Sequence, residues 1–155
     1  MPETEPEIEP IAPAPVPWEY SLSIPNDPRA VTVSRRTLRL ILTMHGLIAL
    51  VDVAELLASE LVSNAVRHTE GPAALRVRWS AGVLRIGAWD ADPRPPEPPR
   101  ELGQLVEPES ESEDGRGLGM VVACADLWGW QPLSRFGNRG KYVWCELATG
   151  VSTCA

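Results

Sequence analysis

A carboxylate and a carboxamide lie four residues apart in the stretch ELVSNAVRHT, which runs from residue 60 to residue 69. In a helix this spacing places Glu60 and Asn64 on one face. A glutamate there can accept a proton, and an asparagine carbonyl oxygen can ligate a hard cation such as Mg2+. Helical Glu and Asn side chains are most often simply solvated. The pair therefore needs support from other parts of the chain.

A second carboxylate, Asp90, ends the alternating apolar run of residues 83–89 in VLRIGAWDADP. Alternation of this kind predicts a strand. A carboxylate at the end of a strand can accept a hydrogen bond from an exocyclic amino group such as that of adenine.

Three glycines, Gly115, Gly117 and Gly119, lead into a predicted helix over about residues 118–127. Glycines let the backbone approach an anion closely, and the N–H groups at a helix start favour phosphate. The pattern alone is equally typical of a flexible loop with a tight turn. Arg116, inside this loop, could contact a transferring phosphoryl group, whereas Arg67 could do so or be solvated.

The order of these features resembles the GHKL ATP-binding superfamily, to which gyrase, histidine kinases and MutL belong. The single short domain, with ELVSNAVRHT, WDADPRPP and GRGLGM, looks most like the anti-sigma-factor serine/threonine kinase branch over about residues 18–148. The fold expected from this resemblance and from the order of elements is α+β. It is a two-layer sandwich of the histidine-kinase-like ATPase type, with helices on one face of a mixed, mainly antiparallel sheet.

The resemblance implies ATP and Mg2+ as ligands, with a role for each matching residue. Asn64 would hold Mg2+, Glu60 would act as the general base, and Asp90 would bind adenine. The loop from residue 115 to residue 120 would hold the phosphates. His68 could orient the carboxylate or be a structural residue. The implied nucleotide-binding set is Asn64, His68, Asp90, Asp92, Gly115, Arg116, Gly117, Leu118, Gly119 and Met120.

Two contact positions depart from the family pattern. The first lid hinge reads DADPR over residues 90–94, so it lacks the usual two glycines and gains a proline that fixes φ. Tyr142 follows Gly140 and Lys141 in the last strand, at the place where the family often has a threonine near adenine. Both changes bear on affinity and turnover.

The implied function is that of an anti-sigma factor that phosphorylates an antagonist protein, with a sigma factor as second partner and a homodimer as the implied assembly. The alternative is a non-catalytic ATP-binding module that sequesters a regulatory partner. The stiffened hinge and Tyr142 favour the alternative, whereas retention of Glu60 and Asn64 favours the kinase. A histidine-kinase module would need a dimerisation helix pair, and a supercoiling or mismatch-repair ATPase would need a transducer domain.

The expected organisation is an acidic, proline-rich tail (1–17), an ATP-binding domain (18–148) with a lid (91–114), and a short C-terminal tail (149–155). The expected elements are a strand over 18–24, a helix to about 45, a second helix after Asp52, hairpin strands over 74–81 and 83–90, and a final pair over about 129–136 and 141–147. Asn26, Asp27 and Pro28 are predicted to start the first helix, and Asp52 to cap the second. Its predicted buried stripe is Ala54, Leu57, Leu61 and Ala65.

Charge is divided unevenly along the chain. The formal net charge is −7, but 11 of the 21 acids lie within residues 3–9 and 97–114. With Arg100 set aside, 10 acids and 13 bases remain, a balance of about +3 that is too small for a nucleic-acid stripe. The arginines of the first helix are a solvated face or a docking surface for an acidic partner: Arg29, Arg35, Arg36 and Arg39.

The three cysteines, Cys124, Cys145 and Cys154, have no metal or disulfide spacing, which fits a reducing, cytoplasmic compartment. No apolar run reaches the length of a membrane span, and the N-terminus does not read as a signal peptide. The tryptophans are expected in the core or at sheet edges rather than on a base-stacking platform.

Overall fold

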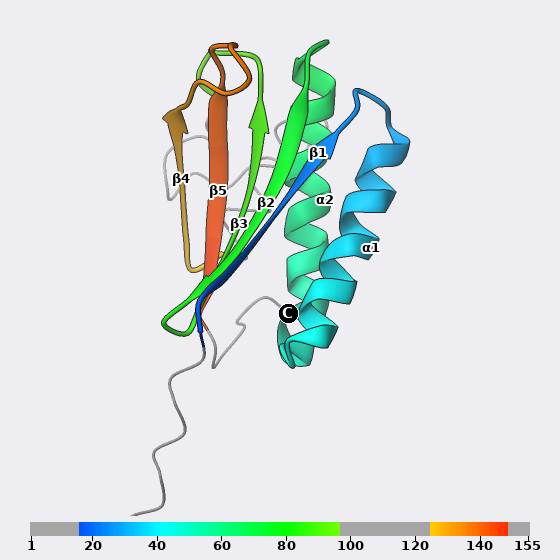
Figure 1. Ribbon diagram of the computed structural model, residues 1–155, viewed down its shortest axis with the longest axis vertical. Coiled ribbons are helices and arrows are strands. Elements are labelled where there is room, and N and C mark those ends of the chain that lie inside the picture. The colour runs from blue at the N-terminus through cyan, green and yellow to red at the C-terminus, as the bar shows by residue number, and fades with distance from the viewer. Residues whose placement is uncertain (1–15, 97–124, 149–155) are drawn as a thin grey trace, which may run out of the picture.

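The computed structural model describes residues 16–96 and 125–148 of the 155-residue chain. Its elements in chain order are β1 (Trp18–Ile24), α1 (Arg29–Met44), the 3-10 turn η1 (Ile48–Leu50), α2 (Val51–His68), β2 (Ala73–Ser80), β3 (Val83–Asp90), β4 (Leu127–Pro132) and β5 (Lys141–Ala148). Both α-helices cover the same face of the sheet (Figure 1). The predicted α+β sandwich of two layers is confirmed.

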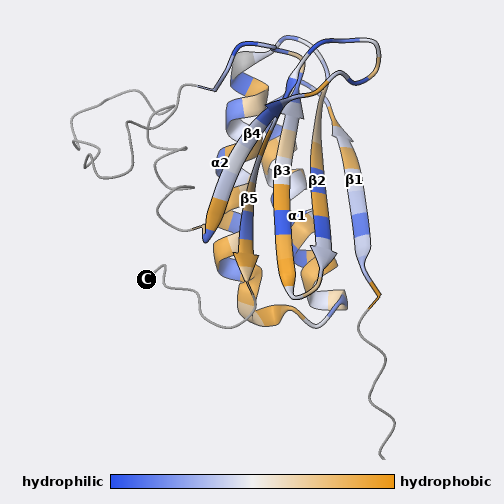
Figure 2. Cartoon of the chain, turned by 90° about the vertical axis from the view of Figure 1, so that its left-hand side faces the viewer, coloured by the Kyte–Doolittle hydropathy of each residue, from blue (hydrophilic) through white to orange (hydrophobic). Residues whose placement is uncertain are grey.

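One sheet contains the five described strands in the order β1-β2-β3-β5-β4. All four pairings between these strands are antiparallel, where the sequence led us to expect a mixed, mainly antiparallel sheet. Figure 2 views the sheet from the side opposite the helices, and the strands appear there in this order.

The predicted hairpin of β2 and β3 forms because its two-residue turn can adopt positive φ angles. Ala81 has a φ of 52° and Gly82 one of 80°, which match the right-handed twist of the strands on either side. The resulting register pairs Ala73 with Asp90. Asp90 therefore lies at the end of the sheet where β2 begins.

The core lies between α2 and the inner face of the sheet. All four residues of the predicted stripe on α2, Ala54, Leu57, Leu61 and Ala65, are buried. They belong to the same cluster as Leu84 and Ile86 of β3 and Cys145 of β5. Cys145 is a small core residue, and its burial raises the pKa of its thiol to about 12.

The two helix starts differ from each other. At α1 the carboxylate of Asp27 accepts a hydrogen bond from the Arg29 N–H at 2.8 Å, in agreement with the predicted start. The prediction that Asp52 caps α2 is wrong: Leu50 precedes the helix in an α-helical conformation and Asp52 lies inside the first turn. The backbone passes from η1 into α2 without an extended residue, so a side-chain cap has no place there.

The second half of the sheet corrects two further predictions. The helix expected over 118–127 does not include its last three residues, because Asp126 donates its N–H to the Glu146 carbonyl and Leu127 already starts β4. β4 also ends at Pro132 rather than near 136. The chain then turns at Phe136 and Gly137, whose φ angles are 55° and 76°.

Tyr142 lies on the outer face of the sheet, away from the helices. Its ring covers Gly87, where an added Cβ would collide with it. It packs with Trp89 and Ala74 in a small cluster separate from the main core. Burial there raises the pKa of Tyr142 to about 12. The alternation of β5 therefore points Tyr142 to the face opposite the one that carries Asp90 and Lys141.

Neither α-helix of the described chain is long and apolar enough to cross a membrane. The glycine loop, most of the predicted lid and nearly all of both predicted tails lie outside the described residues.

Candidate functional site

Three of the elements that carry candidate residues meet at one end of the domain. β3 ends at Asp90, β5 begins at Lys141, and the two residues are paired across the strands. α2 ends nearby, since only residues 69–72 separate it from β2, whose first residue pairs with Asp90. Figure 1 shows the end of α2, the end of β3 and the start of β5 at the same end of the molecule.

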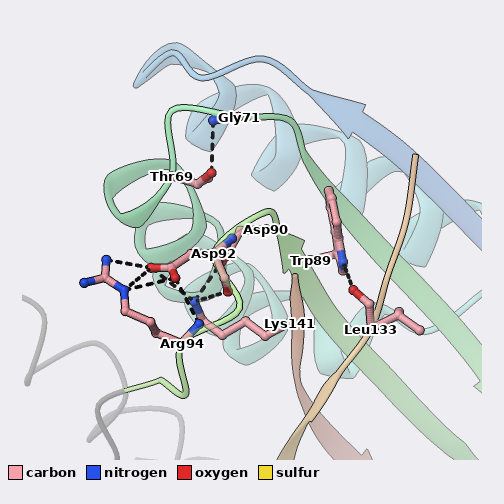
Figure 3. Close-up of polar contacts among 8 residues, drawn as sticks. All are labelled: Thr69, Gly71, Trp89, Asp90, Asp92, Arg94, Leu133 and Lys141. Carbon is pink, nitrogen blue, oxygen red and sulfur yellow. Dashed lines mark hydrogen bonds and ion pairs between the residues drawn. The ribbon is translucent and has the colours of Figure 1, made fainter. Parts of the chain in front are cut away.

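The carboxylate of Asp90 is buried and held by two donors (Figure 3). The Nζ of Lys141 donates to Asp90 Oδ1 at 3.1 Å, and the backbone N–H of Asp92 donates to the same oxygen at 2.9 Å. Among the residues that the structure describes, none donates a hydrogen bond to the other oxygen, Oδ2. One oxygen thus fixes the side chain, and the other is available to a ligand.

The hinge after Asp90 is held by its own side chains. The bond from the Asp92 N–H to the Asp90 carboxylate is followed by one from the Arg94 N–H to the Asp92 carboxylate at 3.0 Å. Each joins a carboxylate to the backbone two residues on, which is an Asx turn. Lys141 also donates to the Asp92 carbonyl oxygen at 3.2 Å. These bonds and Pro93 agree with the stiff hinge that the sequence predicts.

The two carboxyl groups of the hinge have pKa values that move in opposite directions. Burial raises the pKa of Asp90, while the Asp92 N–H and the Lys141 ammonium oppose that rise. The hydrogen bonds from Arg94, whose Nη2 lies 2.9 Å from Asp92 Oδ2, lower the pKa of Asp92 to about 2. Asp92 therefore pairs with Arg94 and stays ionised, whereas Asp90 Oδ2 has no hydrogen-bond donor among the described residues.

Close packing between loop and strand keeps this end of the sheet in place. A Cβ at Gly140 would collide with the carbonyl oxygen of Asp90, so only glycine allows β5 to start here. On the outer face, the indole N–H of Trp89 donates to the Leu133 carbonyl at 2.8 Å (Figure 3). The loop between β4 and β5 is thereby tied to the residue that precedes Asp90.

Glu60 and Asn64 both lie half-buried on α2, beside the buried stripe rather than within it. Asn64 is one turn from the end of the helix, and Glu60 is one turn further back. Their intermediate exposure places both side chains at the rim of the core. Each stays accessible to a ligand or a partner from one side.

The remaining predicted site residues lie outside the part of the chain that the structure describes. Gly115, Arg116, Gly117, Leu118, Gly119 and Met120 lie in the undescribed segment 97–124. His68 ends α2, but its side chain lies outside the description. Lys141 is the residue that sequence reasoning missed, although it is the one lysine of the chain and is placed directly after Gly140.

Comparison with known proteins identifies a family. A family model described as Histidine kinase-like ATPase domain matches residues 24–144, more than three quarters of the chain. The match begins at the last residue of β1 and ends inside β5, so it spans the described helices and most of the sheet. A search of the curated proteins gave no match.

Proposed function

Because the chain belongs to the histidine kinase-like ATPase domain family, we propose that it is an anti-sigma factor that uses ATP to phosphorylate a serine or threonine of an antagonist protein. The family supports ATP binding as such. The kinase activity, the antagonist, the sigma factor as second partner, a cytoplasmic location and a homodimer are the finer parts of the proposal. We assign the ATP-binding domain to residues 18–148 and the lid to residues 91–114.

The observation that carries the nucleotide site is the unequal use of the two Asp90 oxygens. Oδ1 is fixed by Lys141 and Asp92, and Oδ2 accepts no bond within the described chain. A buried acceptor in a fixed orientation fits an exocyclic amino group such as that of adenine. Asp90 would thus bind the base, with Asp92 keeping the hinge in shape through Arg94.

A divalent cation fits the same end of the domain only if the nucleotide supplies most of its ligands. The described residues contain no group of three His, Cys, Asp or Glu side chains able to hold a metal. Mg2+ commonly takes one or two protein oxygens and completes its shell with phosphates and water. The Asn64 carbonyl oxygen, half-buried near the end of α2, would hold it and so neutralise phosphate charge.

Glu60 would act one helical turn from Asn64 as the general base. Its carboxylate would accept the proton of a partner's serine or threonine hydroxyl while that oxygen attacks the γ-phosphorus. The bond from the γ-phosphorus to the bridging oxygen then breaks, and ADP leaves. The products are ADP and a phosphorylated partner, with the proton on Glu60.

A surface for protein partners is available on α1. Its outward face exposes the apolar side chains of Val33, Leu40 and Met44, with Arg36 between them. Exposed apolar groups in a row on one helix face are typical of protein contacts. Two other arginines of α1 form ion pairs within the domain, Arg29 with Asp27 and Arg39 with Glu55. These pairs weaken the hypothesis that the arginines of α1 bind an acidic partner.

The second candidate is a non-catalytic module that binds ATP and sequesters a partner. The hinge favours it, because two Asx turns, Pro93 and Lys141 oppose the movement that a lid needs during turnover. The exposed stripe on α1 serves either function. The two candidates therefore differ in the role of Glu60, which acts as a general base only in the kinase.

The test is transfer of the γ-phosphoryl group from labelled Mg2+-ATP to a purified antagonist protein. Glu60→Gln should lower the transfer rate about 100-fold or more while leaving ATP binding intact. Glu55→Gln is the matched control, since Glu55 is on the same helix but faces Arg39 of α1. Undiminished transfer in Glu60→Gln refutes the base assignment. ATP binding without transfer by the intact chain favours sequestration.

A further inference from the structure

Lys141 has a donor to spare in a place where few cations are found. The side chains of Lys141 and Asp90 are only 6% and 4% exposed. An ammonium carries three N–H donors, and two of these serve Asp90 Oδ1 and the Asp92 carbonyl. The Asp92 carboxylate oxygen Oδ2 lies 4.0 Å from Lys141 Nζ, beyond hydrogen-bond length.

Stability alone gives a weak reason for this pair. Desolvating two charges costs several kcal/mol per ion, and apolar side chains of similar size are often at least as stabilising. A ligand contact, by contrast, needs a donor and an acceptor side by side. Lys141 Nζ and Asp90 Oδ2 provide that combination: each has unused capacity within the described chain, and both belong to one fixed pair.

We propose, on the basis of the proposed function, that Lys141 is a specificity-determining residue that donates a hydrogen bond to N1 of adenine while Asp90 Oδ2 accepts one from the 6-amino group. The Watson–Crick edge of adenine presents that donor beside that acceptor, and enzymes read bases by this edge. Guanine presents a carbonyl oxygen and an N–H in the reverse order. The pair therefore selects adenine over guanine.

The direct test changes the ligand and leaves the protein intact. Calorimetric titrations of the full chain compare the Mg2+ complexes of ATP, 1-deaza-ATP, 7-deaza-ATP and GTP. A hydrogen bond from a charged group is worth roughly a 10- to 100-fold change in affinity. We expect that loss for 1-deaza-ATP, a loss of about 100-fold or more for GTP, and no loss for 7-deaza-ATP.

Protein variants identify the donor. Lys141→Met should bind ATP and 1-deaza-ATP equally, with thermal unfolding as the check that it folds. If Lys141→Met does not fold, the comparison of ATP with 1-deaza-ATP on the intact chain still decides whether N1 accepts a hydrogen bond. Arg85→Met is the matched control. It removes the cation of the β3–β5 ion pair on the other face of the sheet, so the variant should still bind ATP more tightly than 1-deaza-ATP.

The outcomes separate a failure of the Lys141 assignment from a failure of the proposed function. Equal binding of ATP and 1-deaza-ATP by the intact chain overturns the role of Lys141 and leaves the proposed function standing. A loss with 7-deaza-ATP instead overturns the assignment to N1. Binding of none of the nucleotides overturns the proposed function and this inference with it.

Discussion

Strands β3 and β5 carry two cation–carboxylate pairs at directly opposed positions, Asp90 with Lys141 and Arg85 with Glu146. The members of the two pairs are five residues apart along each strand, so they lie on opposite faces of the sheet. Lys141 and Asp90 are 6% and 4% exposed, whereas Arg85 and Glu146 are 32% and 20% exposed. Arg85 donates to Glu146 Oε1 from Nε at 2.9 Å and also stacks over Trp144, 4.1 Å from the ring centroid.

The difference between the pairs lies in what happens when one partner is removed. Water can replace the lost partner of an exposed ion, but a buried ion is left without compensation. Removing one partner of the outer-face pair, Arg85 and Glu146, should therefore cost little stability. Removing one partner of the pair on the helix-covered face, Lys141 and Asp90, should cost much more. This buried pair is the one beside the predicted base site.

The largest effect is expected for Lys141→Met. Removing the ammonium leaves the buried Asp90 carboxylate without its cation, which should lower the free energy of unfolding by about 3–5 kcal/mol at pH 7. Urea unfolding followed by circular dichroism measures it. A loss below about 1 kcal/mol would mean that Asp90 is solvated and that the contrast between the two faces is wrong.

A smaller, pH-dependent effect is expected for Asp92→Asn. The pKa of Asp92 is lowered to about 2, so its stabilisation is present above the unfolded value near 4 and disappears as pH falls from about 4 to about 2. Because Arg94 is mostly exposed, we expect only about 1 kcal/mol. Urea unfolding from pH 6 to pH 2 should show wild type and variant converging in acid; a constant difference would contradict the Arg94 pairing.

Arg85→Met should have a still smaller effect. It removes a partly exposed ion pair and a cation–π contact with Trp144, together worth roughly 0.5–1 kcal/mol. Raising the salt concentration should shrink the difference from wild type, because solvent-exposed charges are screened. A loss comparable to that of Lys141→Met would erase the distinction between the faces.

The smallest change in stability is expected when both members of the buried pair become apolar. Asp90→Leu/Lys141→Met leaves no uncompensated charge, so its free energy of unfolding should lie within about 1 kcal/mol of wild type. Its affinity for Mg2+-ATP should nevertheless be lost. Thermal unfolding and calorimetry of the same sample separate the two properties, and a double variant as unstable as Lys141→Met would show that the pair stabilises the fold.

Features that depend on near neighbours could be predicted from the sequence. The strand β1, the hairpin of β2 and β3 and the apolar stripe of α2 each follow from local propensity and periodicity. The position of Asp90 at a strand end followed from the same signals. The half-buried setting of Glu60 and Asn64 followed from the phase of the helix.

Features set by distant partners could not be predicted in this way. Lys141 meets Asp90 across 51 residues of chain, and only the register of β3 and β5 brings them together. The same register turns Tyr142 to the outer face. Asp52 does not cap α2 because the backbone is already helical at Leu50. The side-chain chemistry of Asp52 gives no sign of this. The glycine loop stays a prediction, since residues 115–120 lie outside the described chain.

We propose that Asp90 and Asn64 form a nucleotide site at the end of the domain where β3 ends. Calorimetric titration of the intact chain with Mg2+-ATP, beside Asp90→Asn, Asn64→Ala and the outer-face control Glu146→Gln, tests it most directly. We expect saturable binding by the wild type and Glu146→Gln, and none by the other two variants. Binding that survives Asp90→Asn, or no binding by the intact chain, would contradict it.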